Sequence, residues 1–441
     1  MLGFGTDGIR GAANIDVTPE IALALGRGAT RHLPGSPWLL GRDTRRSGPM
    51  LLAALAAGIA SEGCDVVDCG VIPTPGLAWL AGERGLPAAM VSASHNPYSD
   101  NGIKLFGAGG SKLSVADEAA ISEELTRTGR GPLGAAGSVG QIRIETEAAM
   151  SYAERLVTAV PSAAGYSGRI VVDCANGAAS DVAPAVYGRL GLEHTAINAT
   201  PDGTNINAGC GSTDLAMLQR AVRSTGASLG IAFDGDADRM LAVDDAGEVV
   251  DGDQLIALFA ADLHEQGQLV GGHVVVSVLS NLGLRLALSK RGLSVVETPV
   301  GDRHISDALE TGGYVLGGEQ SGHVIFRQHA STGDGILTSL KLIDLLARRS
   351  EALSDLASEA MRRLPQVIVN VPVRDQHRLA GASAVWREVT AVEAELGTAG
   401  RVLVRPSGTE PAVRVMVEGP TVEEVQAQAN RLAAVVEREL A

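Results

Sequence analysis

The chain is poor in aromatic residues and in cysteine, and it has no long apolar run. Aromatic residues are 3% of its 441 residues, so Ala, Val, Leu and Ile must build the cores. The four cysteines, Cys64, Cys69, Cys174 and Cys210, form no C-x-x-C pair, which favours a reducing compartment over a disulfide framework. No apolar run reaches the ~18 residues of a membrane span, and the first residues lack the pattern of a signal peptide. We therefore expect a soluble, cytoplasmic protein.

Positive charge is also scarce. The chain has 36 Lys and Arg against 51 Asp and Glu, a formal net charge of −15. Repulsion between like charges argues against nucleic acid or an anionic membrane as the main partner. A small phosphorylated ligand can still bind where Arg, Lys, Ser and backbone N–H groups cluster.

Glycine is in excess, at 55 of 441 residues, about 12% against a usual ~7%. These glycines follow no short period, which excludes collagen and a flexible tract. Many loops in which backbone approaches a ligand closely would account for them.

Short apolar runs alternate with helical patterns, and the pattern restarts twice. Thr18-Pro19 and Thr74-Pro75 each indicate the start of a helix, and a linker helix is expected around Ile144–Val157. The expected strands of these segments are Trp38–Leu40, Asp65–Asp68, Ala88–Val91, Arg169–Asp173, Ser228–Phe233, His273–Val278, Ser294–Glu297 and Tyr314–Leu316. This alternation predicts an α/β fold with largely parallel or mixed sheets.

From about Val367 the pattern changes to three strands followed by a helix at Val422–Leu440, which predicts a smaller α+β unit. Although length alone suggests roughly three domains, we expect four, of which the first three share one plan. The expected domains are 1–150, 151–250, 251–365 and 366–441.

In each of the first three segments a strand runs directly into a polar loop. These loops are S-A-S-H-N-P at 92–97, D-G-D-A-D-R at 234–239 and G-E-Q-S-G-H at 318–323. Open α/β sheets bind ligands at the carboxyl ends of their strands. The three loops are therefore candidate parts of a functional site.

The first loop places Ser94 after a buried strand and before a turn-forming Asn-Pro, which suits an exposed and rigidly held hydroxyl. A plain Ser or Asn turn is the alternative. The loop is not a G-x-S-x-G elbow, so acyl-hydrolase chemistry has little support. His95 is adjacent in sequence, which is poor support for a role as the base of Ser94; it could equally hold the loop.

The second loop carries Asp234, Asp236 and Asp238 at alternate positions. Three adjacent carboxylates repel one another unless a cation offsets their charge, and all-oxygen ligands suit Mg²⁺ or Ca²⁺. An EF-hand is excluded because Arg239 stands at the required glycine and Asp245 at the closing glutamate. A solvated acidic turn is the alternative.

The third loop surrounds Glu319, Ser321 and His323 with glycines, which would suit hydrogen bonds to the hydroxyls of a sugar. His323 is either a half-buried histidine or a proton carrier near neutral pH. A surface loop is the alternative for the whole segment.

A fourth loop, Arg405-Pro406-Ser407-Gly408-Thr409, is followed by Arg414. Its hydroxyls, free N–H groups and two arginines could cradle a phosphate, although it is not a Walker A loop. A solvated hairpin is the alternative. Arg10, Lys104 and the run Gly41-Arg42-Asp43-Thr44-Arg45 add basic residues near glycines, and an ordinary surface charge is the alternative for each.

A nucleophilic hydroxyl, an oxygen-ligand metal site, a sugar loop and a phosphate cradle together describe phosphoryl transfer on a sugar. The set, in this order over the whole chain, resembles the α-D-phosphohexomutase family. The resemblance implies four domains around a central cleft, a phosphosugar substrate, Mg²⁺, a phosphorylated serine and a hexose 1,6-bisphosphate intermediate. It also implies a monomer or homodimer.

The resemblance also assigns roles to particular residues. Ser94 matches the phosphorylated serine, which holds Mg²⁺ together with Asp234, Asp236 and Asp238. The positions expected near the transferring phosphoryl group are Arg10, Lys104, Arg239 and His323. The positions expected to bind the sugar and its other phosphate are Glu319, Ser321, Arg405, Ser407, Gly408, Thr409 and Arg414.

Within the family, the opening F-G-T-D-G-I-R-G, Gln320 and Gly408 resemble the branch that acts on glucosamine phosphates. We therefore expect interconversion of glucosamine 6-phosphate and glucosamine 1-phosphate, for UDP-N-acetylglucosamine synthesis. The sister branch, for mannose and glucose phosphates, usually has Met and Asn at the last two positions. That branch, a phosphomonoesterase that uses Ser94 and a metal, and a non-catalytic phosphosugar sensor are the alternatives.

Overall fold

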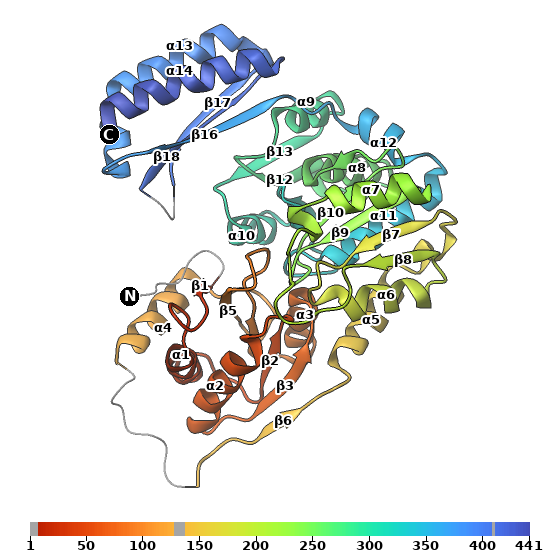
Figure 1. Cartoon of the computed structure of the whole chain (residues 1–441), viewed down its shortest axis with the longest axis vertical. Coiled ribbons are helices and arrows are strands. Elements are labelled where there is room, and N and C mark those ends of the chain that lie inside the picture. The colour runs from red at the N-terminus through yellow and green to blue at the C-terminus, as the bar shows by residue number, and fades with distance from the viewer. Residues whose placement is uncertain (1–7, 128–136, 408–410) are drawn as a thin grey trace. The chain divides into compact units, whose positions relative to one another are not determined.

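The computed structural model describes residues 8–127, 137–407 and 411–441, so Gly408 and Thr409 lie outside the described residues. Its strands form four sheets (Figure 1). The chain divides into two compact units, and each is described by itself. The first runs up to Leu279 and resumes over Leu293–Glu359, and the second comprises Ser280–Gly292 and Ala360–Ala441.

The first sheet has the strand order β1-β5-β4-β2-β3-β6. β4, β2, β3 and β6 run parallel, whereas β5 is antiparallel to both β4 and β1. Its strands are β1 (Ile9–Ala12), β2 (Trp38–Arg42), β3 (Val66–Val71), β4 (Ala88–Val91), β5 (Asp100–Phe106) and β6 (Ile142–Ile144). The helices beside it are α1 (Pro19–His32), α2 (Gly48–Ser61), α3 (Thr74–Arg84) and α4 (Val115–Arg127).

The central strands β2 and β4 are buried on both faces of this sheet, which explains why they read as continuous apolar runs. Successive side chains of a strand point to opposite faces. Leu40 accordingly packs in a cluster with residues of α1, α2 and α4, whereas Leu39 packs in a cluster with residues of α3. As predicted, Thr18 caps α1 with a side-chain hydrogen bond to the Ile21 amide, and α3 begins at Thr74.

The second and third sheets follow the same plan. Their orders are β11-β10-β9-β7-β8 and β13-β12-β14-β15. The strands are β7 (Ile170–Asp173), β8 (His194–Ile197), β9 (Leu229–Phe233), β10 (Met240–Val243), β11 (Val249–Val250), β12 (His273–Ser277), β13 (Ser294–Thr298), β14 (Leu316–Gly318) and β15 (Val324–Phe326). The helices are α5 (Ala148–Ala159), α6 (Ala179–Arg189), α7 (Ala216–Thr225), α8 (Gly252–Glu265), α10 (Asp302–Gly312), α11 (Gly335–Arg349) and α12 (Leu353–Ala360).

One hairpin recurs in these three sheets and positions the polar loops. A strand with a parallel neighbour turns back into an antiparallel strand: β4 into β5, β9 into β10, and β14 into β15. The connecting segments contain the loops at 92–97, 234–239 and 319–323. The three loops thus lie at strand ends, as the sequence predicts.

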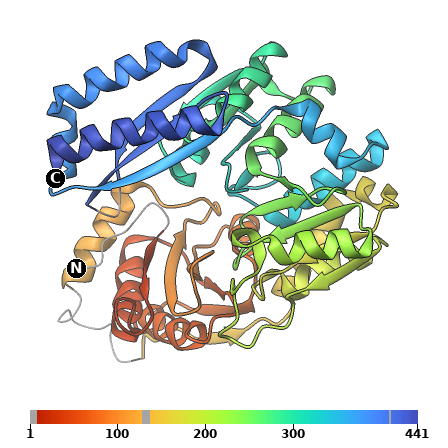
Figure 2. The same cartoon turned by 45° about the horizontal axis from the view of Figure 1, so that its top comes forward.

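The second unit contains a three-stranded antiparallel sheet with β18 (Ala412–Glu418) between β16 (Gln366–Pro372) and β17 (Arg401–Pro406). α13 (Ser383–Leu396) and α14 (Val422–Leu440) lie side by side on one face of this sheet (Figure 2). α9 (Leu282–Lys290) belongs to the same unit, because the Glu418 carboxylate accepts a hydrogen bond from the Leu282 amide.

Two expected elements are present with shifted bounds. The linker helix expected around Ile144–Val157 is α5, which begins at Ala148, because Ile144 is the last residue of β6. The pairing of β6 with β3 supplies backbone hydrogen bonds that only the folded chain offers. The strand predicted at Tyr314–Leu316 is shifted to Leu316–Gly318, because β12 and β15 pair with its two glycines. Among the described residues, no helix is long and apolar enough to cross a membrane.

Candidate active site

The Ser94 loop meets the aspartate loop inside the first unit. The Ser94 hydroxyl is buried and donates a hydrogen bond of 2.5 Å to Asp234 Oδ2. Ser94 has a φ of +50°, in the left-handed region that L-residues with a side chain rarely adopt. Gly235 permits this close approach, since a Cβ there would lie 2.5 Å from the Ser94 carbonyl oxygen.

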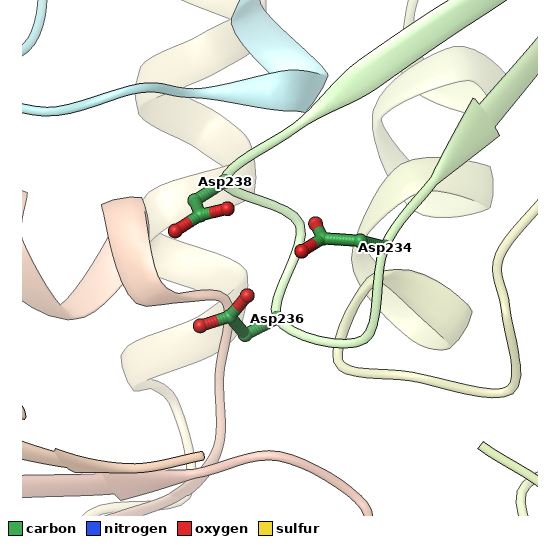
Figure 3. A group of neighbouring side chains, drawn as sticks. All are labelled: Asp234, Asp236 and Asp238. Atoms are coloured by element: carbon green, nitrogen blue, oxygen red, sulfur yellow. The ribbon is translucent and has the colours of Figure 1, made fainter. Parts of the chain in front are cut away.

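Asp234, Asp236 and Asp238 are all buried, and one carboxylate oxygen from each lies within 4.8 Å of the others (Figure 3). Oδ2 of Asp236 accepts hydrogen bonds from Thr74 Oγ1 at 2.6 Å and from Lys104 Nζ at 2.8 Å. Its Oδ1 is buried and has no hydrogen-bond partner among the described residues. One carboxylate oxygen is therefore held ready to bind a ligand that is not part of the chain.

The electrostatics of this loop fit a divalent cation. Burial raises the pKa of Asp234 well above its ordinary range, and the charges of Asp238 and then Asp236 raise it further. A bound cation would reverse this effect, because it favours the ionised carboxylates. Clustered carboxylates with an unpartnered buried oxygen are the donor set that Mg²⁺ uses.

Lys104 lies on β5 beside the same carboxylates. Its ammonium bonds Asp236 Oδ2 at 2.8 Å and Asp238 Oδ2 at 3.1 Å, and the side chain is buried. Burial alone raises the pKa of Asp238, but the charges of Lys104 and His323 outweigh it and hold that pKa well below its ordinary range. Lys104 thus links the first sheet to the aspartate loop.

His323 follows Gly322 in the third loop and is buried next to Asp238. Its Nδ1 lies 3.8 Å from Asp238 Oδ1, and its Nε2 accepts a hydrogen bond of 3.0 Å from the Gly333 amide. Burial lowers the pKa of His323, but Asp238 outweighs it and raises that pKa above its ordinary value. The Gly333 amide opposes protonation of Nε2, so the proton of the neutral ring lies on Nδ1, facing Asp238.

Arg10 and Arg239 bring positive charge near His95, the neighbour of Ser94 in the loop. Burial lowers the pKa of His95 to about 4, and the charges of Arg239 and Arg10 contribute to the shift. The His95 ring, whose Nδ1 lies 3.4 Å from Ser94 Oγ, is therefore neutral at neutral pH. Two arginines near His95, the residue after Ser94, suit a phosphoryl group on that serine.

Glu319 and Ser321 lie in the same unit, on the turn between β14 and β15. Glu319 Oε1 accepts a hydrogen bond of 3.3 Å from the Gly301 amide. Ser321 Oγ is buried and has no partner among the residues that the structure describes. Gly322, with a φ of +90°, leaves no room for a Cβ, which would lie 2.2 Å from the Met240 carbonyl oxygen. The sugar loop therefore packs on the strand that follows the aspartate loop.

Arg405 and Arg414 face each other across β17 and β18 in the second unit. Each has a buried Nε without a hydrogen-bond partner among the described residues, as has the hydroxyl of Ser407. Burial lowers the pKa of Arg405, and the charge of Arg414 lowers it further. Two adjacent like charges and an unpartnered hydroxyl are typical of an anion site.

Four residues to which the sequence assigned no role support the site. Thr74 holds Asp236, and Asn207 donates to the Ser94 carbonyl oxygen at 2.9 Å. Arg45 and Asp43 are buried beneath the Ser94 loop. The run Gly41–Arg45 shows a charged pair in the sequence, but nothing in it indicates that both charges are buried.

Comparison with known proteins identifies the family. The domain I, II, III and IV descriptions of the phosphoglucomutase/phosphomannomutase family match residues 1–130, 150–247, 251–364 and 368–435. The phosphoglucosamine mutase of Thermobifida fusca is 50% identical to this chain. The match covers 99% of this chain and 98% of that protein. The phosphoglucosamine mutase of Salinispora arenicola is 50% identical, and its match covers 98% of this chain and 97% of that protein.

Solved structures share the fold at lower identity. A putative phosphomannomutase from Thermus thermophilus is 24% identical, with a TM-score of 0.80 over 99% of each chain. An N-acetylphosphoglucosamine mutase from Aspergillus fumigatus, solved with GlcNAc-6P and magnesium, is 20% identical. Its TM-score is 0.73, over 100% of this chain and 96% of that one. From its four domains and its full-length relatives, the chain belongs to the phosphoglucomutase/phosphomannomutase family of α-D-phosphohexomutases.

Proposed function

We propose that the chain is a phosphoglucosamine mutase, an isomerase that interconverts glucosamine 6-phosphate and glucosamine 1-phosphate for UDP-N-acetylglucosamine synthesis. The observation that carries the proposal is the contact between Ser94 Oγ and the buried aspartates. Full-length relatives at about half identity that bear this name support the choice of substrate.

Ser94 is the phosphoryl carrier in this proposal. Phosphorylated Ser94 gives its phosphoryl group to the free O1 or O6 of a hexose monophosphate. The bond from phosphorus to Ser94 Oγ breaks as the bond to the sugar oxygen forms, the proton of the sugar hydroxyl passes to a base, and Ser94 Oγ takes up a proton. The resulting 1,6-bisphosphate turns around and returns its other phosphoryl group to Ser94 Oγ. Lys104 and His323, both beside Asp238, are the groups that would exchange protons with the reacting oxygens.

Mg²⁺ would be held by Asp234, Asp236, Asp238 and the phosphate on Ser94. When bound, it neutralises negative charge on phosphoryl oxygens. Thr74 and Lys104 orient Asp236 by occupying its Oδ2, which leaves Oδ1 for the cation. Arg10 and Arg239 supply further positive charge near Ser94.

The other site residues would bind the parts of the substrate that do not react. Glu319 would accept hydrogen bonds from the sugar hydroxyls, and Ser321 would donate or accept them. Arg405, Ser407 and Arg414, with Gly408 and Thr409, grip the phosphate that is not being transferred. Unpartnered polar atoms on Ser321, Arg405, Ser407 and Arg414 support this assignment.

We further propose that the domains are 1–150, 151–250, 251–365 and 366–441, with the last acting as a lid, and that the protein is cytoplasmic. All four cysteines carry free thiols, which supports a reducing compartment. We also propose a monomer or homodimer.

The test is a coupled assay with glucosamine 1-phosphate, glucose 1-phosphate and mannose 1-phosphate, each with Mg²⁺ and the matching 1,6-bisphosphate. We expect the highest kcat/KM for glucosamine 1-phosphate. A clear preference for the mannose compound would assign the chain to the sister branch. Phosphate released to water at the rate of turnover would make it a phosphomonoesterase.

A further inference from the structure

The guanidinium of Arg45 lies beneath the Ser94 loop with no exposure to solvent. It donates hydrogen bonds to the carbonyl oxygens of Ser94 and Asn96, both at 2.8 Å. It also donates to the carbonyl oxygens of Pro97 and of Asp100, the latter at 3.0 Å. One side chain therefore gathers four backbone carbonyls of the segment that carries Ser94.

Asp43 completes this arrangement from the other side. Its Oδ2 accepts from Arg45 Nε at 2.9 Å and from the Ser92 hydroxyl at 2.6 Å. The Ser92 Oγ in turn accepts a hydrogen bond of 2.9 Å from the Ser94 amide. Both the amide and the carbonyl of Ser94 are thus connected to one buried ion pair.

This connection matters because of the backbone conformation of Ser94. A φ of +50° is unfavourable for a residue with a side chain, and such a residue persists only where its surroundings over-determine it. Relaxation to a negative φ would turn the hydroxyl away from Asp234. The fixed, planar set of five N–H donors of arginine can hold several carbonyls at once, which a lysine ammonium cannot do in the same way.

We propose that Arg45, paired with Asp43, is a positioning residue that holds Ser94 Oγ against the metal-binding aspartates during phosphoryl transfer. The inference rests on the proposed role of Ser94 as phosphoryl carrier. Arg45 touches neither the substrate nor the reacting atoms in this account; it acts through the backbone of the loop.

The test compares the double variant Arg45→Met/Asp43→Asn with the wild type. Removing both charges leaves no unpaired buried ion, so the fold should survive. We measure the rate at which a hexose 1,6-bisphosphate phosphorylates the dephosphorylated protein, by intact mass, together with kcat, KM and Tm. A displacement of about 1 Å can cost ~100-fold in rate. We therefore expect kcat and the phosphorylation rate to fall about 100-fold, with KM nearly unchanged.

Ser92→Ala is a second, smaller change that disconnects the Ser94 amide from Asp43. It should slow phosphorylation about 10-fold, which is roughly the effect of losing one hydrogen bond. Arg84→Met, whose ion pair with Glu145 is partly exposed, is the matched control and should keep the wild-type rate. Wild-type rates in a folded double variant, or in Ser92→Ala if the double variant does not fold, would overturn the inference. Failure of the wild type to become phosphorylated on Ser94 would overturn the proposed function instead.

Discussion

Two residues other than glycine have a positive φ in the loops that meet at the site. Ser94 has a φ of +50° and Ala237 one of +57°, and neither is glycine. Each such conformation costs on the order of 1–3 kcal/mol, and outliers of this kind cluster where function requires them. At the scale of single residues, the site therefore rests on strained backbone that its neighbours hold in place.

Ser94→Ala should abolish turnover, because no other hydroxyl among the described residues contacts Asp234 as Ser94 does. Intact-mass analysis should find one phosphate on the active wild type and none on the variant. Ser99→Ala is the matched control, since Ser99 is an exposed serine of the same loop. Mutase activity above a few per cent in Ser94→Ala would rule out the phosphoserine proposal.

Asp236→Asn should weaken Mg²⁺ binding by at least ~10-fold while leaving stability almost unchanged. The variant loses a ligand charge and half of the Lys104 ion pair, but Lys104 keeps its bond to Asp238 and a buried carboxylate that repels Asp234 is removed. Titration calorimetry with Mg²⁺ and thermal melts in EDTA measure the two effects. Asp355→Asn, at an exposed position of α12, is the control, and equal Mg²⁺ affinities in all three proteins would count against the site.

At the scale of elements, the recurrent hairpin explains how three separate sheets contribute to one site. β4, β9 and β14 each lead through a polar loop into an antiparallel strand. The loops lie close enough that glycine is needed between them. A Cβ on Gly235 would reach the Ser94 carbonyl, and one on Gly322 would reach the Met240 carbonyl.

Gly235→Ala should lower kcat strongly and destabilise the protein by ~1–3 kcal/mol, the usual cost of overpacking. The added methyl would lie 2.5 Å from the Ser94 carbonyl oxygen and would push the two loops apart. Gly188→Ala is the control, because its Cβ would meet nothing within 4 Å and alanine favours a helix. Full activity in Gly235→Ala, at a wild-type melting temperature, would contradict this packing argument.

Arg405→Ala, on β17, should raise KM and lower kcat while leaving Ser94 phosphorylation and Mg²⁺ binding intact. The substrate phosphate that is not transferred would lose a binding partner. The binding energy of that phosphate positions the reacting hydroxyl of the sugar. More bisphosphate should also escape per turnover. Arg387→Ala, at an exposed site of α13, is the control; unchanged KM and unchanged leakage in Arg405→Ala would refute the role of this strand.

At the scale of the whole molecule, all proposed metal ligands belong to the first compact unit and the arginine pair to the second. Mg²⁺ should therefore stabilise the first unit alone. At 100 times its Kd the cation should add about 2.7 kcal/mol. Scanning calorimetry should show a rise in one transition, reversed by EDTA and absent in Asp236→Asn. Equal shifts throughout the melting profile would contradict this division.

The sequence by itself determined the mixed α/β plan, the three strand-end loops and the aspartates as a candidate metal site. These features depend on local patterns: apolar runs, helix caps such as Thr18, and alternate carboxylates. It did not determine β6 or the bounds of β14, a strand that ends in two glycines. An edge strand and a strand of glycines form through pairing with strands distant in the chain.

Only the tertiary structure decided which residues support Ser94. Arg45 lies 49 residues from Ser94 in sequence, and Thr74 lies 162 residues from Asp236. Burial gives these contacts their strength, because a charge or hydroxyl removed from water must find its partner within the protein. Burial depends on how distant segments pack, and no local run of residues specifies that.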